Sequence, residues 1–544
     1  MLGSQIPSRA ASPPRLAALR FVSIRSRTAW EIVALVSVLV VGTVARLHDL
    51  GEDSLWLDEA FSVYVAKQPL GRMMEIITAH DTPPPLYYAL LHAWLGLGLG
   101  DQAQSVRLLS VALGIASICV IYLCGREIGG PHVGLAAALL LAVSPFRVWY
   151  SQEARMYALL ALLCGLSALL LWRALMRGGA GAWIGYTLTT SLALYTQISA
   201  VFFVFGEGVA VLLVLLARSS HAESGRVSWG GVASAVARVW RGEQRTLGVW
   251  IVSQLVIALL WLPWLPFFLR QGEIYQRFWI PAPTWVTVKQ VLFDLTAIHF
   301  PHWLMPRGME LLVIGGVALA LLGGRSLTRP AYVFFLALFL APMLAMYAVS
   351  QVKPVFVSRA LIYVSMPYIL LMAAGLVSLK RWNVGAALLG LVVLLNLVSL
   401  YRIYGVVEKE QWDRAASHVL ANAAPHELVL FVAADAQIAF DYYAERDVKP
   451  LERRGLPVDV LSVGPLEPRM EEHDLARMDA LIEGRDSFWL VQSHTAFADP
   501  TELARRHADE RYRRVDAQEL QGVTLFRYDA SAAQAVNRRQ IPAR

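Results

Sequence analysis

A long apolar run leads directly into a cluster of acids in the stretch Ile32-Val-Ala-Leu-Val-Ser-Val-Leu-Val-Val-Gly-Thr-Val-Ala-Arg46-Leu-His-Asp-Leu-Gly-Glu52-Asp53-Ser-Leu-Trp56-Leu-Asp58-Glu59. Such a run predicts a membrane helix that ends near Arg46, and Trp56 suits the headgroup layer. Adjacent acids beside apolar side chains can serve as base, acid or metal ligand at a membrane surface. The alternative is an ordinary solvated loop.

The composition places the chain among polytopic membrane proteins. Of its 544 residues, 56% are hydrophobic and only 16% charged, which excludes an ordinary soluble protein. The net charge is +7, but residues 403–544 carry 24 acids against 18 bases, so the surplus lies in the membrane part. Loop topology explains such a surplus, and we expect no nucleic-acid partner. The three cysteines lie in apolar segments without disulfide or metal-ligand spacing.

Apolar runs of spanning length predict a mainly α protein with about eleven transmembrane helices. The run 183–217 is too long for one helix and is divided near Gln197. No small-residue cleavage site follows the first run, so we expect that helix to be retained. The expected spans are 30–47, 104–125, 132–147, 157–175, 183–197, 199–217, 248–269, 309–324, 331–350, 359–379 and 383–402.

Basic residues occur in every segment that this map places inside the cell. The map predicts a multi-pass protein of the inner (plasma) membrane with a basic cytoplasmic N-terminus, residues 1–29. The membrane domain spans 30–402, with a first external loop at 48–103. Residues 405–544 are expected to form an extracytoplasmic domain.

The first external loop contains a second polar element. Residues 66–80 mix apolar and charged side chains as expected for a helix lying on the membrane. His80 and Asp81 follow, directly before a run of three prolines that holds the chain extended. Leu86–Leu99 then predicts another interfacial helix. His80 and Asp81 are candidate site residues, and the alternative is that the prolines only end a helix.

Two later loops repeat the combination of proline and charge. Pro145 should break a helix, and Tyr150, Glu153 and Tyr157 would share a face if a helix restarts there. Charges such as Glu153 and Arg155 are costly at a membrane boundary unless they are solvated or paired. Snorkelling of the side chains is the alternative for this loop and for the last external turn. That turn places two cations around Pro354, namely Lys353 and Arg359.

The tail changes character from about residue 405. An amphipathic helix is expected through Ala421 and another at 499–509. Leu428–Val432, Phe488–Val491 and Val523–Tyr528 predict strands, and together these elements predict a small α/β domain. The tail contains no Gly-rich phosphate loop or nucleophile motif.

The order of these motifs resembles the GT-C superfamily of polytopic glycosyltransferases. The resemblance covers roughly residues 30–402 and is closest to the bacterial branch related to protein O-mannosyltransferases and lipid A aminoarabinose transferases. In the O-mannosyltransferases the proline motif begins His-Pro-Pro, whereas here it begins His80-Asp-Thr-Pro, so the role of His80 is left open. The matching motifs are Leu55-Trp-Leu-Asp58-Glu59-Ala, Asp81-Thr-Pro-Pro-Pro-Leu-Tyr-Tyr88, Ser144-Pro145, Gln152-Glu153-Ala-Arg155-Met-Tyr157, Lys353-Pro354 and Ser358-Arg359.

The resemblance implies a hexosyl- or pentosyltransferase that moves a sugar from a polyprenyl-phosphate donor to an envelope lipid, glycan or protein. Asp58 would be the general base of an inverting displacement, and Glu59 its supporting partner or an alternate base. The remaining roles follow the chemistry of the groups. The donor phosphate would be bound by Arg155, Lys353 and Arg359, and the acceptor or its surroundings by His80, Asp81, Glu153 and Tyr157. Some relatives use a divalent metal, and Asp58, Asp81 and Glu153 would then be its ligands.

Three other classes of protein are alternatives, of which a non-catalytic scaffold for the tail would leave the Asp58, Asp81 and Glu153 loops unexplained. A transporter or flippase of lipid-linked sugars typically places ionisable residues within its spans. Here the acids concentrate in loops, and Glu207 is the one carboxylate deep in the middle spans. An O-antigen ligase or polymerase would depend more on external arginines than on an early Asp-Glu pair. The sequence leaves open which sugar is moved and what receives it.

Overall fold

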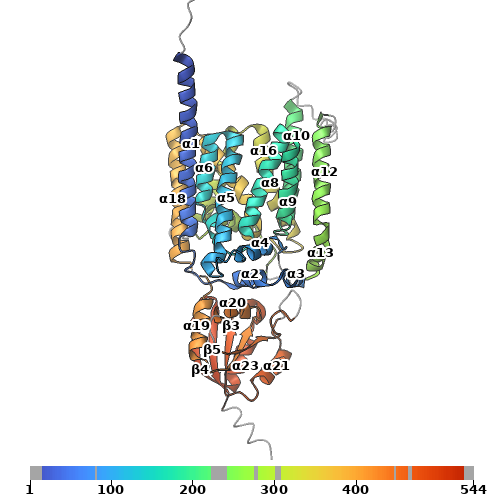
Figure 1. Ribbon diagram of the computed structural model, residues 1–544, viewed down its shortest axis with the longest axis vertical. Helices are drawn as coiled ribbons and strands as arrows, with labels where there is room; N and C mark the ends of the chain where they lie inside the picture. Colours follow the sequence, from blue (N-terminus) through green and yellow to red (C-terminus); the bar gives the residue numbers. More distant parts are fainter. Residues whose placement is uncertain are drawn as a thin grey trace, which may run out of the picture.

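The computed structural model describes residues 15–79, 83–221, 242–274, 280–299, 308–407, 409–445, 449–462 and 469–531. A bundle of apolar helices makes up most of the chain, and a small sheet domain follows at its C-terminal end (Figure 1). The sheet domain and the helices of the first loop lie at the same end of the bundle (Figure 1). The predicted fold class is therefore confirmed.

Within the described residues, nine helices are long and apolar enough to cross a membrane. Some of these spans consist of two helical pieces joined end to end, as at η5 and α17. The helices of the bundle are α1 (Arg15–Leu47), α5 (Ala103–Gly129), α6 (Pro131–Ala142), α8 (Tyr157–Arg177), α9 (Ala180–Leu194), α10 (Ala200–His221), α12 (Gln244–Trp261), η1 (Leu262–Trp264), α13 (Leu265–Ile274), α15 (Gly308–Leu322), η4 (Gly323–Arg325), α16 (Arg329–Val349), η5 (Ser358–Val364), α17 (Ser365–Val377) and α18 (Trp382–Gly405).

The expected number of eleven spans is an approximation. The expected spans 132–147 and 183–197 are the shorter helices α6, with 12 residues, and α9, with 15. A helix rises about 1.5 Å per residue, so neither matches a hydrocarbon layer of about 30 Å by length alone. The expected break near Gln197 is present, because α9 ends at Leu194 and α10 begins at Ala200.

Short helices occupy the loops at the end of the bundle that faces the sheet domain. The first loop forms α2 (Leu57–Lys67), α3 (Leu70–Ala79) and α4 (Leu86–Leu95), which lie across the end of the bundle (Figure 1). Two further short helices are α7 (Pro145–Trp149) and α14 (Trp285–Ala297). The chain from Tyr150 to Met156 is a non-helical turn. The shared helical face expected for Tyr150, Glu153 and Tyr157 is therefore wrong, since the helix restarts only at Tyr157.

The C-terminal domain has a five-stranded sheet in the order β2-β1-β3-β5-β4. Strands β1, β2 and β3 are parallel, while β5 runs antiparallel to both β3 and β4. Its strands are β1 (Leu428–Val432), β2 (Glu452–Leu456), β3 (Ser487–Gln492), β4 (Arg513–Leu520) and β5 (Val523–Asp529). Its helices are α19 (Trp412–Asn422), α20 (Ala436–Ala444), η6 (Glu472–Asp474), α21 (Leu475–Ile482), α22 (Thr495–Ala498) and α23 (Leu503–Arg511).

Both faces of this sheet are covered. Successive residues of a strand point to opposite faces, and β1 is buried at every position. Val429 and Phe431 belong to the core shared with α19 and α20. Leu428 and Leu430 belong to a second core with α21 and α23. The sheet is thus a middle layer, and the carboxyl ends of its three parallel strands share one edge.

Candidate active site

Helix α2 places Asp58 and Glu59 in its first turn, where the helix dipole favours negative charge. The residue before the helix, Trp56, supplies no side-chain cap. The backbone N–H of Leu57 instead donates to Glu410 Oε2 of the tail at 3.2 Å. A residue more than 350 positions away in the chain therefore helps to fix the start of this helix.

Glu59 points into the protein and has no exposed surface. Arg107 Nη2 and Nε donate to its two oxygens at 2.7 and 2.9 Å, and the N–H of Ala154 donates at 2.7 Å. Lys409 Nζ lies 3.6 Å from Oε2. Burial opposes the charge of Glu59, but the two cations and the hydrogen bonds lower its pKa to about 2.

Arg107 on α5 organises the acidic loop that precedes α2. Besides Glu59, its guanidinium donates to the carbonyl oxygens of Leu50, Asp53 and Ser54 at 2.9 to 3.0 Å. A buried guanidinium needs such complete pairing. The sequence analysis missed Arg107, although an arginine inside an expected span was a usable signal for a buried partner.

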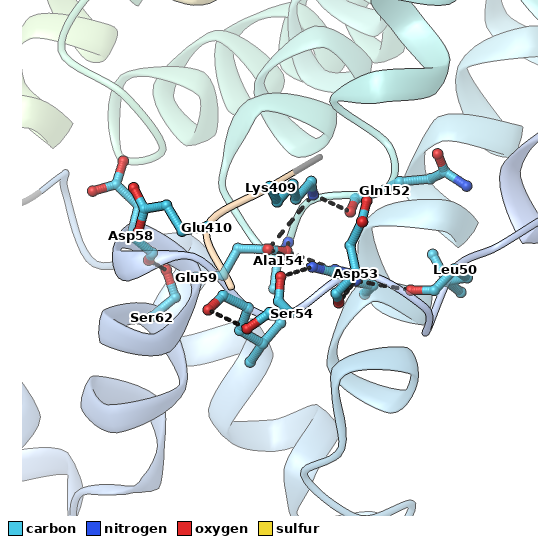
Figure 2. A network of polar contacts seen from close by, with 12 residues as sticks. Leu50, Asp53, Ser54, Asp58, Glu59, Ser62, Gln152, Ala154, Lys409 and Glu410 are labelled. Atoms are coloured by element: carbon cyan, nitrogen blue, oxygen red, sulfur yellow. Dashed lines mark hydrogen bonds and ion pairs between the residues drawn. The ribbon is translucent and has the colours of Figure 1, made fainter. Parts of the chain in front are cut away.

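Asp58 points away from Glu59 and is 33% exposed (Figure 2). Its Oδ2 lies 3.4 Å from Arg155 Nη2 and 3.9 Å from Arg359 Nη1. Arg155 Nη1 also donates to the carbonyl oxygen of Asp58 at 3.3 Å. Two of the three predicted phosphate-binding cations therefore lie beside the predicted base.

The two arginines are held by different elements. Arg155 lies in the turn before α8, and its Nη1 donates to Ser62 Oγ of α2 at 3.4 Å. Arg359 lies in η5, next to Ser358. The Ser358 hydroxyl donates to Asp294 Oδ2 of α14, and Gln290 Nε2 donates to Oδ1 at 2.8 Å. Asp294, which the sequence analysis did not single out, thus ties α14 to the segment that carries Arg359.

Other predicted site residues are placed with less contact to Asp58. Lys353 is exposed in the loop between α16 and η5. Tyr157 is buried as the first residue of α8, with its ring 5.0 Å from that of Tyr150. His80 and Asp81 lie outside the described residues. The roles given to these residues stay predictions.

Glu153 lies in the same turn as Arg155 and is only 3% exposed. Within the described part of the chain, its Oε2 has no hydrogen-bond partner. Burial raises its pKa to about 7, against the lowering effect of the nearby Lys409 charge. A carboxyl group with such a pKa can take up and release a proton near neutral pH.

The tail contributes two further residues that the sequence analysis missed, Lys409 and Glu410. Lys409 Nζ donates to the carbonyl oxygen of Gln152 at 3.4 Å (Figure 2). It also lies 5.2 Å from the ring centroid of Trp149. Glu410 Oε2 also accepts from Trp412 Nε1 at 2.7 Å. A small cavity of about 40 Å³ adjoins Lys409 and Arg107, with room for a few water molecules.

The donor set around Asp58 gives little support for a divalent metal. Such ions prefer several oxygen ligands, whereas the Asp58 carboxylate is shared between two guanidinium groups. Within the described ranges, no three acids, histidines or cysteines gather as a metal site. Asp81 lies outside these ranges, and we derive no step through a metal.

The chain resembles known proteins in part of its sequence and in its fold. Residues 81–240 match the sequence model of the family described as dolichyl-phosphate-mannose-protein mannosyltransferase. Among curated proteins, none matches the chain by sequence.

Solved structures of two kinds share the fold. ArnT from Cupriavidus metallidurans in its apo state superposes with a TM-score of 0.59 at 14% identity, covering 93% of this chain and 99% of that one. The same enzyme bound to undecaprenyl phosphate gives 0.55 at 13% identity, with 92% and 98% covered. The oligosaccharyltransferase of Archaeoglobus fulgidus gives 0.51 at 11% identity, with 91% and 73% covered.

Proposed function

We propose that this chain, which has the fold of the GT-C superfamily of membrane glycosyltransferases and matches one of its family models in part, transfers a sugar from a polyprenyl-phosphate carrier to an envelope acceptor. The observation that carries the proposal is the placement of Asp58. Its half-exposed carboxylate lies between Arg155 and Arg359 at the end of the bundle. A lipid-linked donor that enters sideways from the bilayer would meet this group at the interface.

Arg155 and Arg359 bind the phosphate of the donor. Guanidinium groups form strong, often bidentate hydrogen bonds to phosphate oxygens. As the bond between the anomeric carbon and the phosphate oxygen breaks, negative charge develops on that oxygen, and the two cations stabilise it. Lys353, in the loop that leads to Arg359, is a third candidate for this role. The carrier in the solved ArnT complex is undecaprenyl phosphate, which supports a polyprenyl-phosphate donor here.

Asp58 acts as the general base. The acceptor hydroxyl attacks the anomeric carbon and gives its proton to the Asp58 carboxylate while the polyprenyl phosphate leaves. One displacement inverts the configuration at that carbon. The ion pairs with the arginines orient the Asp58 carboxylate before the acceptor arrives.

Glu59 supports this arrangement from the buried side of α2. Its bidentate pairing with Arg107 anchors α2 and the loop before it, so its place favours the supporting role over that of an alternate base. Glu153, His80, Asp81 and Tyr157 remain candidates for acceptor binding. The reaction takes place on the outer face of the inner membrane, as the charge distribution of the loops predicts.

Replacement of Asp58 by Asn tests the proposal. The amide keeps the size of the side chain but cannot accept the proton, so we expect transfer to fall by about 10² to 10⁴. Envelope glycolipids, glycans and glycoproteins are compared by mass spectrometry in a strain that lacks the gene and carries either variant. Purified protein is tested for binding of undecaprenyl phosphate and for thermal stability, which should both be retained.

A matched control is Asp49→Asn, the same change at an exposed acid of the same loop, for which we expect wild-type transfer. Near-wild-type transfer by Asp58→Asn would contradict the assignment of the base. Absence of any envelope difference between the strains with and without the gene would contradict the proposed function itself.

A further inference from the structure

Two polar side chains of the C-terminal domain lie at the edge of the sheet where ligands commonly bind. In open α/β sheets, ligands bind beyond the carboxyl ends of parallel strands. Strands β1 and β3 are parallel neighbours, with Val432 opposite Gln492 at their ends. Asp435 follows β1 and His494 follows β3. Both therefore lie on loops that leave the same edge of the sheet.

The backbone of both loops is held in an unusual form. Ala433 has a φ of 70° and His494 a φ of 53°, a left-handed conformation that residues with a Cβ rarely adopt. Such conformations persist where the surrounding structure fixes them, and they are enriched at functional sites. The two loops thus present Asp435 and His494 in defined positions.

The hydrogen bonds of His494 identify its charge state. Ser493 Oγ donates its single proton to the carbonyl oxygen of Gly522 at 2.9 Å, so it must accept from His494 Nδ1 in their 2.9 Å contact. His494 Nε2 lies 3.3 Å from the carboxylate of Glu410, which can only accept. These partners favour a proton on both ring nitrogens, and thus the imidazolium form of His494.

This edge of the sheet faces Asp58. Glu410, the partner of His494, accepts from the N–H of Leu57, the residue before Asp58. Burial and then the charge of Asp58 raise the pKa of Asp435 to about 6. The hydrogen bond to Glu410 raises the pKa of His494 against the effect of burial, and the charges of Glu410, Asp58 and Asp435 act in the same direction. Asp58, Asp435 and His494 therefore lie within electrostatic reach of one another.

We propose, on the basis of the function proposed above, that Asp435 and His494 form the acceptor side of the site and bind the hydroxyl groups of a sugar acceptor. A sugar presents neighbouring hydroxyls that each donate and accept. The Asp435 carboxyl group accepts from such hydroxyls, and the Nε2–H of His494, which lies 3.3 Å from Glu410, can be shared between Glu410 and a hydroxyl.

Under this assignment, the two parts of the chain bind different substrates. The loops of the membrane part bind the donor phosphate through Arg155 and Arg359, and the C-terminal domain selects the acceptor. Asp58 lies where the two meet.

The test compares Asp435→Asn and His494→Gln with two matched controls. Asp486→Asn changes an exposed aspartate directly before β3, at the opposite edge of the sheet, and His473→Gln changes a histidine that is 76% exposed. Each variant is expressed in the strain that lacks the gene, and its product is measured by mass spectrometry in the glycan, glycolipid and protein fractions. Purified variants are tested for binding of undecaprenyl phosphate.

We expect both site variants to lower the product at least about tenfold, the effect of losing a charged hydrogen bond to substrate. Binding of undecaprenyl phosphate should stay within about twofold of wild type, since the donor side is intact. The controls should match wild type in both measurements. Asp435→Ser replaces Asp435→Asn if the latter does not fold.

Three results would overturn the inference. Wild-type product from both site variants would show that these side chains do not bind the acceptor. Parallel loss of undecaprenyl phosphate binding would place them on the donor side. Product found only on protein would exclude a sugar acceptor. If the wild-type protein neither binds undecaprenyl phosphate nor changes the envelope, both the proposed function and this inference fail. The wild-type measurements alone reveal that outcome.

Discussion

Asp58 and Glu59 are neighbours in the chain, but their environments are opposite. Residues that follow each other in a helix point about 100° apart, so one side chain faces the open side of the site and the other the interior. Glu59 has no exposed surface, whereas Asp58 is 33% exposed. This difference supports a structural role for Glu59 and the proposed chemical role for Asp58.

Loss of the charge of Glu59 should destabilise the fold. Glu59→Gln leaves Arg107 buried without its partner, which typically costs about 3 kcal/mol or more. The pKa of Glu59 is about 2, below the usual value of 4.5, so its charge stabilises the protein above pH 4.5 and this contribution disappears as the pH falls towards 2. Thermal melts should show a large deficit for Glu59→Gln at pH 7 that shrinks with acidification.

The exposed neighbour Glu52 supplies the control for this experiment, since Glu52→Gln removes a carboxylate of the same loop. We expect Glu52→Gln to have the wild-type melting temperature both at pH 7 and at acidic pH. A pH-independent deficit in Glu59→Gln would show that packing, and not charge, explains the loss.

The two arginines beside Asp58 make a separate prediction. Arg359→Gln removes one proposed partner of the donor phosphate, and we expect the affinity for undecaprenyl phosphate to fall about tenfold or more. Titration of purified protein measures this directly. Arg325→Gln, at an exposed arginine of η4, should bind as wild type does. Equal affinities of Arg359→Gln and wild type would exclude Arg359 from the phosphate site.

At the scale of elements, the sequence predicts those whose patterns are buried and misses those whose patterns are polar. The strand expected at Leu428–Val432 has those bounds in the structure, because an apolar run buried on both faces gives a clear signal. Strands β2 and β4 read Glu-Arg-Arg-Gly-Leu and Arg-Arg-Val-Asp-Ala-Gln-Glu-Leu. They are the two edge strands, where charged side chains are tolerated and the alternation weakens.

The close packing of α5 against α6 gives a prediction about an element. A Cβ added at Gly134 would lie 2.8 Å from the carbonyl oxygen of Tyr122, and a Cβ added at the facing Gly125 would lie 2.7 Å from Gly134 Cα. Small residues let membrane helices approach closely. Gly134→Ala should therefore force the helices apart. We expect the free energy of unfolding to fall by about 1 to 3 kcal/mol and the melting temperature to fall with it.

Gly181→Ala in α9 is the matched control, because nothing lies within 4 Å of its added Cβ. Alanine is the better helix former, so we expect an unchanged or slightly higher melting temperature. Identical melts for the two variants would mean that the contact between α5 and α6 relaxes at little cost.

At the scale of the whole molecule, the site is assembled from parts that only the fold brings together. The sequence identified Asp58, Arg155 and Arg359 by charge at membrane boundaries, and the structure places them within ion-pair distance. The sequence could not identify Lys409, Glu410 or His494 as neighbours of α2, because a tail without a recognisable motif carries no signal for where it packs. Charge alone marks a residue as in need of a partner, while the partner is set by tertiary packing.

The same arrangement predicts the orientation of the protein in the membrane. The first loop and the C-terminal domain lie at one end of the bundle (Figure 1) and are joined by hydrogen bonds, such as that from the N–H of Leu55 to Tyr443 Oη at 2.7 Å. They must therefore share a side of the membrane. Basic residues gather in the loops assigned to the opposite side, so we predict that this shared side is the outer one. A reporter enzyme that works only outside the cytoplasm should be active when fused after residue 544, and a cytoplasmic reporter fused there should be silent. A fusion to the loop after α10, near residue 221, should give the reverse pattern, and activity of the cytoplasmic reporter at residue 544 would move the whole site to the inner face.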